Sequence, residues 1–106
     1  MCRFKTWHSD EHGYVIQCEE CFHFQVSFGT TMLTMDHVQY HHFTETICKR
    51  VEDRLPMPDP NCKCIILPTH TEAIHIILSD NELSRLHDMI QLADTEMRTK
   101  ALMDLF

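Results

Sequence analysis

Glycine is scarce in this chain of 106 residues, which contains only Gly13 and Gly29. A loop that cradles a phosphate needs several glycines within a few positions, because its backbone N–H groups must approach the anion closely. Two glycines far apart in the sequence cannot build such a loop. Nucleotide-binding sites of the Walker and dinucleotide types are therefore excluded.

Positive charge is also scarce, since nine Lys and Arg stand against sixteen Asp and Glu, and the formal net charge is −7. Binding to nucleic acid in general requires clustered cations that neutralise phosphates. The one local group of cations, Lys49, Arg50 and Arg54, is interrupted by Glu52 and Asp53. The charge pattern argues against a nucleic-acid partner.

Long apolar runs are missing as well. The purely aliphatic stretches are short, such as residues 65–67 and 76–78, whereas a membrane-spanning helix needs about 20 apolar residues. No apolar stretch follows the positive charges of the first residues, so no signal peptide is expected. We therefore expect a cytoplasmic protein with no membrane partner.

Cysteine and histidine are abundant instead, with six and nine copies. In a cytoplasmic protein, cysteines are expected to be reduced thiols or metal ligands. The rival interpretation is a secreted chain in which all six cysteines are paired, an arrangement with 15 possible connectivities. The C-x-x-C spacing of Cys18 and Cys21 and the C-x-C spacing of Cys62 and Cys64 favour chelation over structural bridges.

Alternating apolar and polar residues predict strands in the first third of the chain. Residues 2–18 are predicted to form a hairpin around the polar turn 9–13. The clearest strand comes next, and its apolar positions lie on one face: Phe22, Phe24, Val26 and Phe28. Gly29 then marks either a bulge or a tight turn before residues 31–34. Two more short strands are predicted over residues 64–67 and 74–78.

A capping box precedes each of two helical patterns: Asp36 pairs with Gln39, and Ser79 pairs with Glu82. Each box is followed by an apolar stripe at helical spacing. The stripes are Tyr40, Phe43, Ile47, Val51 and Leu55 in the first helix, and Leu83, Leu86, Ile90, Ala93 and Met97 in the second. Prolines at positions 56, 58 and 60 are expected to end the first helix.

The predicted order of elements is β-β-β-(β)-α-β-β-α. Clustered strands followed by helices are typical of the α+β class. We predict a single α+β domain over residues 1–106, with a small antiparallel sheet of four to six strands and two helices on one face of it.

Cys18 and Cys21 flank a turn between two predicted strands. A redox-active C-x-x-C pair lies at a helix N-terminus, where the helix dipole lowers the thiol pKa, and the residues after Cys21 alternate as a strand instead. Two cysteines at a strand turn are typical of a zinc knuckle, in which the thiolates lie side by side.

Further zinc ligands depend on how the strands align. If Trp7 pairs with Tyr14 in the first hairpin, Cys2 lies near Cys18 and supplies a third ligand. The fourth is expected from Cys62, with three histidines as alternatives: His23, His8 and His12. The predicted structural zinc site therefore comprises Cys2, Cys18, Cys21 and Cys62. The competing interpretation is that these cysteines are ordinary small buried residues.

A second group of possible ligands lies on the first predicted helix, where His37, His41 and Glu45 recur every four residues. Such a stripe can bind a metal in a neighbouring site. It lies about 115° around the helix from the apolar stripe, however. A solvent-exposed flank is therefore the favoured interpretation.

Residues 13–18, Cys21 and residues 25–31 resemble an uncharacterised family of small proteins from Bacteroidetes-type bacteria. Residues 67–69 and 81–86 fit the same pattern, so the resemblance covers most of the chain. The family is a domain of unknown function. The resemblance thus implies a small bacterial cytoplasmic protein and transfers no catalytic or cofactor-binding residue.

Three functions stay open at this point. Neither G-x-S-x-G nor H-E-x-x-H occurs, which favours a small binding or regulatory module that acts through protein contacts, with zinc as a structural element. The second possibility is an interaction domain without metal, and the third is a small metal-dependent enzyme using His and Cys residues. The apolar residues within 102–106 also predict a homodimer through the C-terminal helix.

Overall fold

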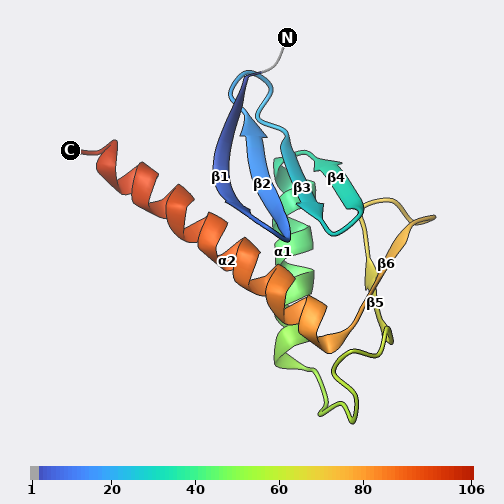
Figure 1. The fold of residues 1–106 in the computed structure, drawn as a ribbon. Coiled ribbons are helices and arrows are strands. Elements are labelled where there is room, and N and C mark those ends of the chain that lie inside the picture. Colours follow the sequence, from blue (N-terminus) through green and yellow to red (C-terminus); the bar gives the residue numbers. More distant parts are fainter. Residues whose placement is uncertain (1–2) are drawn as a thin grey trace.

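A computed structural model describes residues 3–106 and contains two antiparallel sheets and two helices (Figure 1). Its elements, in order, are β1 (Phe4–Asp10), β2 (Gly13–Cys18), β3 (Phe24–Phe28), β4 (Thr31–Met35), α1 (His37–Glu52), β5 (Ile65–Pro68), β6 (His75–Leu78) and α2 (Asp80–Met103). The α+β class and the predicted order are confirmed, and the fourth strand is present.

The first four strands form a meander in which each strand pairs with the next. Between β3 and β4, Phe28 pairs with Thr31, so only Gly29 and Thr30 make the turn. Gly29 has a φ of +58°, a left-handed conformation that glycine adopts without steric cost. Of the two expectations for Gly29, the tight turn is therefore confirmed.

The first hairpin differs in register from the prediction. Tyr14 pairs with Ser9 rather than with Trp7, and the pairing is irregular between Thr6 and His8. The cause is the Asp10 carboxylate, which accepts the backbone N–H groups of residues 12 and 13 at 2.7 and 3.2 Å. This side-chain bond closes a turn shorter than the predicted one, and β1 extends to Asp10.

One face of the four-stranded sheet carries the core. Val15, Val26 and Leu33 are neighbours across three strands, and all three are buried. Helix α2 contacts β1 and β2, and α1 contacts β4 and α2, so both helices cover this face (Figure 1). Most buried helical residues belong to the predicted stripes: Tyr40, Phe43 and Ile47 in α1, and Leu83, Leu86, Ile90 and Ala93 in α2. Met89 is buried although it was not predicted, whereas Val51 and Met97 are only partly buried.

Two predicted apolar positions fall outside the core. Phe22 precedes β3 and is 63 % exposed, and Leu55 follows α1 and is 78 % exposed. Both capping boxes are confirmed in full, with the Asp36 and Ser79 side chains accepting N–H groups at 2.8 and 3.1 Å. These caps explain why the helices begin where the sequence indicates.

Strands β5 and β6 pair only with each other and form a separate ribbon rather than extending the first sheet. The ribbon packs onto the same core through Leu67 and Leu78, which are buried. Across residues 3–106, neither helix offers a stretch long and apolar enough to cross a membrane.

Candidate metal centre at the C-x-x-C loop

The C-x-x-C loop, residues 18–23, connects β2 to β3. Its ends are joined by two backbone hydrogen bonds: Cys18 N–H donates to the His23 carbonyl at 2.9 Å, and Phe22 N–H donates to the Cys18 carbonyl at 3.0 Å. The loop is thus a closed extension of the hairpin. It places Cys18 at the end of a paired strand and Cys21 at the tip.

The Cys18 sulfur accepts two backbone N–H groups of its own loop. Glu20 and Cys21 each donate to Cys18 Sγ at 3.4 Å. Cys18 is 1 % exposed, whereas Cys21 lies at the surface. These two donors are placed to support a metal-bound sulfur at Cys18, because hydrogen bonds orient a metal ligand and tune its charge. A thiolate is the form that binds a metal.

Phe22, the residue after the second cysteine, has a φ of +64°. A left-handed conformation costs a residue with a side chain about 1–2 kcal/mol. Such conformations persist only where the surroundings enforce them, and they cluster at ligand-binding sites. The strained residue lies where the chain leaves the turn and begins to pair with β2 again, at Phe24.

Replacing Phe22 by glycine should raise the free energy of unfolding by about 1 kcal/mol, because glycine adopts the left-handed conformation freely. The Phe22 ring is largely exposed, so its loss removes little packing. Urea denaturation measures the change. Glu20→Gly is the matched control, since Glu20 lies in the same turn, is also exposed and has no positive φ. A stability gain in the control, or none for Phe22→Gly, would contradict the assignment of strain to position 22.

The first of the other predicted ligands, Cys2, lies outside the described residues. Its neighbour Arg3 is described, and the Arg3 carbonyl accepts the N–H of Glu19 at 2.8 Å. Phe4 pairs with Cys18 in the same ladder. The beginning of β1 is therefore hydrogen-bonded directly to the C-x-x-C loop.

Cys62 lies elsewhere. Its neighbours Pro60 and Asn61 are hydrogen-bonded to Asn81 at the start of α2. The segment between α1 and β5 and the β2–β3 connection lie at opposite ends of the molecule (Figure 1). The structure therefore does not bring Cys62 to Cys18 and Cys21.

Among the alternative histidine ligands, only His23 stays next to the loop. His8 pairs with Val15, and residue 12 lies in the β1–β2 turn, at the end of the hairpin away from Cys18. Within residues 3–106, no three His, Cys, Asp or Glu side chains are gathered in a way that could hold a metal. The described part of the site is thus the cysteine pair of the loop.

The second cysteine pair differs from the first in exposure, because Cys62 and Cys64 both lie at the surface. The Cys64 thiol donates to the Cys62 carbonyl at 3.4 Å. Desolvation, followed by the hydrogen bond and charge of Cys62, raises the pKa of Cys64 above its ordinary value. A raised pKa disfavours the thiolate form of Cys64.

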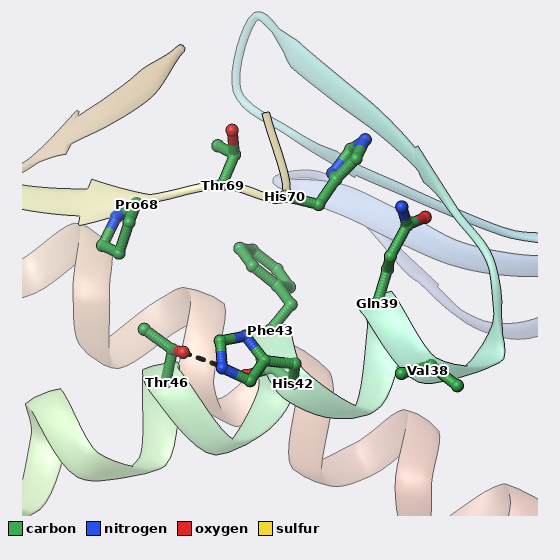
Figure 2. A pocket seen from close by; sticks show the side chains of 8 residues that line it. All are labelled: Val38, Gln39, His42, Phe43, Thr46, Pro68, Thr69 and His70. Atoms are coloured by element: carbon green, nitrogen blue, oxygen red, sulfur yellow. Dashed lines mark hydrogen bonds between the residues drawn. The ribbon is translucent and has the colours of Figure 1, made fainter. Parts of the chain in front are cut away.

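A cleft of about 350 Å³ lies between α1 and the residues that follow β5. Its lining is Val38, Gln39, His42, Phe43, Thr46, Pro68, Thr69 and His70. Figure 2 shows the imidazoles of His42 and His70 on opposite sides of the Phe43 ring, without a common point of approach. Two separated imidazoles do not form a metal site, so the cleft adds no ligand cluster.

A larger cavity, of about 550 Å³, separates α1 from α2 and is called the interhelical groove below. His37, His41 and Glu45 line its α1 side, so the stripe taken from the sequence as a solvent-exposed flank is the rim of this groove. His41 Nε2 lies 3.1 Å from Glu45 Oε1, and both side chains are mostly exposed.

Tyr40 lies at the base of the interhelical groove, stacked on Phe24 with ring centroids 4.0 Å apart. Among the described residues, its buried hydroxyl has no hydrogen-bond partner. Burial, and secondarily the charge of Asp94, raise the pKa of Tyr40 well above its usual range, so the hydroxyl keeps its proton. Sequence patterns did not reveal this feature, because Tyr40 is indistinguishable there from other residues of the apolar stripe.

Comparison with known proteins identifies the family of the chain. A family model described as "Family of unknown function (DUF6686)" matches residues 1–105, in agreement with the resemblance to an uncharacterised family. No curated protein and no solved structure matches the chain. The comparisons therefore supply a family but no activity.

Proposed function

Because the chain belongs to the DUF6686 family, whose function is unknown, we propose a function from the site itself: a small cytoplasmic protein-interaction module stabilised by a structural zinc ion at the C-x-x-C loop. The observation that carries this proposal is the pair of backbone N–H groups that donate to Cys18 Sγ. Metal-binding cysteines need this kind of support, because hydrogen bonds orient a ligand and tune its charge.

The position of the loop gives a zinc ion a structural role. The loop joins β2 to β3, and its Glu19 N–H bonds to Arg3 at the beginning of β1. A metal bound here ties together three neighbouring strands at one end of the sheet. Structural zinc sites contribute directly to folding energy in this way.

The proposed ligands are Cys18 and Cys21, with Cys2 as the third and His23 as the fourth. In the described chain the His23 imidazole is not gathered with the two cysteines, so its side chain must turn towards them when the metal binds. Cys2 adjoins Arg3, which is hydrogen-bonded to the loop, and the His23 carbonyl accepts the N–H of Cys18. Cys62 leaves the predicted set, because its segment lies at the other end of the molecule. A closed set of four protein ligands is the usual composition of a structural site.

One further observation supports the protein-contact part of the proposal. The last residues of the chain expose large apolar side chains, including Leu105 and Phe106, which provide a surface for protein contacts. A cytoplasmic location keeps thiols reduced and available to a metal.

Metal analysis tests the proposal. Protein purified without a metal-affinity column should contain about one zinc per chain by mass spectrometry. The Cys18→Ser and Cys21→Ser variants should each lose it. Cys48→Ser is the control, because Cys48 lies on α1, where its sulfur accepts a hydrogen bond from Gln91, and it should retain zinc. His23→Ala should also lose zinc, whereas Cys62→Ser should retain it.

Two outcomes would overturn the proposal. One is wild-type protein that binds no zinc even when folded with an excess of it. The other is a Cys18→Ser, Cys21→Ser double variant that keeps the metal. In the first case the cysteines are ordinary thiols, and the protein is an interaction domain without metal.

A further inference from the structure

The segment before β5 carries the second cysteine pair, and the chain turns sharply between its two members. The Cys64 N–H donates to the Cys62 carbonyl at 3.0 Å. A hydrogen bond between residues two positions apart closes a γ-turn, the smallest turn of the backbone. The turn brings the two Cα atoms closer together than an extended chain does. Both cysteines lie at the surface, where reagents in solution have access to them.

The Cys64 side chain folds back over this turn. Its Sγ donates to the Cys62 carbonyl oxygen at 3.4 Å. Desolvation, and then a hydrogen bond between the two cysteine side chains, raise the pKa of Cys64, so the two thiols are in contact. A disulfide requires its Cα atoms to be near each other and its Cβ atoms to point towards each other. The γ-turn and the direction of the Cys64 side chain favour both conditions before any bond forms.

The other cysteines of residues 3–106 are not placed to compete for this pair. Cys18 and Cys21 belong to the β2–β3 connection, which lies at the opposite end of the molecule (Figure 1). Cys48 lines the interhelical groove, where its sulfur accepts a hydrogen bond from Gln91 Nε2 at 3.4 Å. Within the described chain, each member of the pair therefore has the other as its neighbouring thiol.

The γ-turn is fixed to the first turn of α2 on both sides of Cys62. Before it, Asn61 Oδ1 accepts a hydrogen bond from Asn81 Nδ2 at 2.8 Å. After it, Lys63 Nζ lies 2.6 Å from Glu82 Oε1, and Glu82 is the residue that closes the α2 capping box. These contacts limit the conformations in which the two thiols separate. The folded chain therefore holds the pair in place for a bond between the sulfurs.

We propose that Cys62 and Cys64 are a site of reversible oxidation, at which a disulfide forms within the pair by exchange with a low-molecular-weight disulfide such as glutathione disulfide. This site is separate from the proposed zinc ligands, because the C-x-x-C loop lies at the other end of the molecule. Neither Cys62 nor Cys64 is needed for the metal, so the two sites are tested independently.

The exchange takes two steps. Cys62, as its thiolate, attacks one sulfur of glutathione disulfide, and a glutathione thiolate leaves. Cys64 then loses its proton to water and attacks the Cys62 sulfur, which releases the second glutathione. Two protein thiols are oxidised to one disulfide, and glutathione disulfide is reduced to two thiols. Cys62 acts first, because the raised pKa of Cys64 keeps that thiol protonated.

Exposure makes such a disulfide easy to reduce again. Exposed disulfides are the labile ones, and cytoplasmic disulfides are typically transient and redox-sensing. In the proposed cytoplasmic setting, the pair should be reduced while glutathione is mostly reduced, and oxidised when glutathione disulfide accumulates. Because a fold that favours the disulfide is stabilised by it to the same extent, oxidation should also raise the Tm of the protein.

Peptide mapping after equilibration in glutathione buffers tests the proposal. Remaining thiols are blocked with N-ethylmaleimide, and the chain is digested with trypsin, which cleaves after Lys63, between the two cysteines. The disulfide keeps residues 55–63 and 64–85 joined until a reductant is added. The wild-type chain should give this joined pair without bound glutathione. Cys62→Ser and Cys64→Ser should each retain one glutathione on the remaining cysteine, and Cys48→Ser, the control, should behave as the wild type.

The same titration in urea separates the contribution of the fold from that of the short spacing. The folded chain should favour the disulfide at least about tenfold more than the unfolded chain, because the anchored turn raises the effective concentration of one thiol at the other. Thermal unfolding should show a higher Tm for the oxidised wild-type chain and no such rise for Cys62→Ser. Equal preference in folded and unfolded chains overturns the proposal. So does wild-type protein that keeps glutathione on both cysteines, or that joins either of them to another cysteine.

Discussion

Replacing Gly13 by alanine is expected to lower the free energy of unfolding by about 3 kcal/mol or more. A Cβ atom at position 13 would lie 1.8 Å from the carbonyl oxygen of Ser27 and 2.8 Å from its carbon. These are backbone atoms of the neighbouring strand β3, and they cannot move aside as a flexible side chain does. Relief therefore requires separating β2 from β3 where Gly13 pairs with Phe28.

Gly29→Ala is the matched control for this prediction. No heavy atom lies within 4 Å of a Cβ built at Gly29, and only its φ of +58° opposes a side chain. The expected loss is about 1 kcal/mol, from backbone strain alone. Urea denaturation curves of both variants provide the comparison. A Gly13→Ala variant no less stable than Gly29→Ala would show that the strands separate without cost.

The two helices were predictable because their signals are local. Asp36 with Gln39 and Ser79 with Glu82 lie within one turn of each helix start, and both boxes form as expected. A capping bond and an apolar stripe depend only on neighbouring positions in the chain. The sequence alone therefore determined where the helices begin and which of their faces is buried.

Strand register was less predictable, because it depends on contacts between distant residues. The first hairpin has an irregular register at Trp7, whose indole Nε1 donates to Gln17 Oε1 at 3.0 Å while Lys5 lies over its ring. Neither contact leaves a periodic signal in the sequence. Similarly, β5 and β6 read as strands, but nothing in their residues indicates that they form a separate ribbon.

The candidate site was likewise predictable only in part. The sequence predicted that Cys18 and Cys21 flank a turn between two strands, and the structure has a closed turn there. The left-handed conformation of Phe22 could not be predicted from the sequence. Glycine is the residue that usually indicates a positive φ, and phenylalanine rarely adopts one. The path of the chain before Cys62 could not be inferred, because it depends on how residues 53–64 pack.

If zinc binds at the C-x-x-C loop as proposed, removing it is expected to cost more stability than any single substitution at the surface. A ligand that binds only the folded state stabilises it by about 4 kcal/mol when its concentration is a thousand times its dissociation constant. For a domain near 100 residues, this corresponds to a fall of roughly 15–30 °C in Tm. Thermal unfolding of the wild-type protein in excess zinc, and then in a chelator, measures the difference.

The Cys18→Ser variant separates the metal from the hydrogen bonds of the loop. A serine oxygen still accepts the N–H groups of Glu20 and Cys21 that now reach Cys18 Sγ, but it is a poor zinc ligand. The variant should therefore unfold near the Tm of the chelated wild-type protein, and added zinc should not raise it. Cys48→Ser, on α1, should keep the full response to zinc. If Cys18→Ser still responds to zinc, the stabilising metal is not bound at this loop, because the backbone donors alone do not bind a cation.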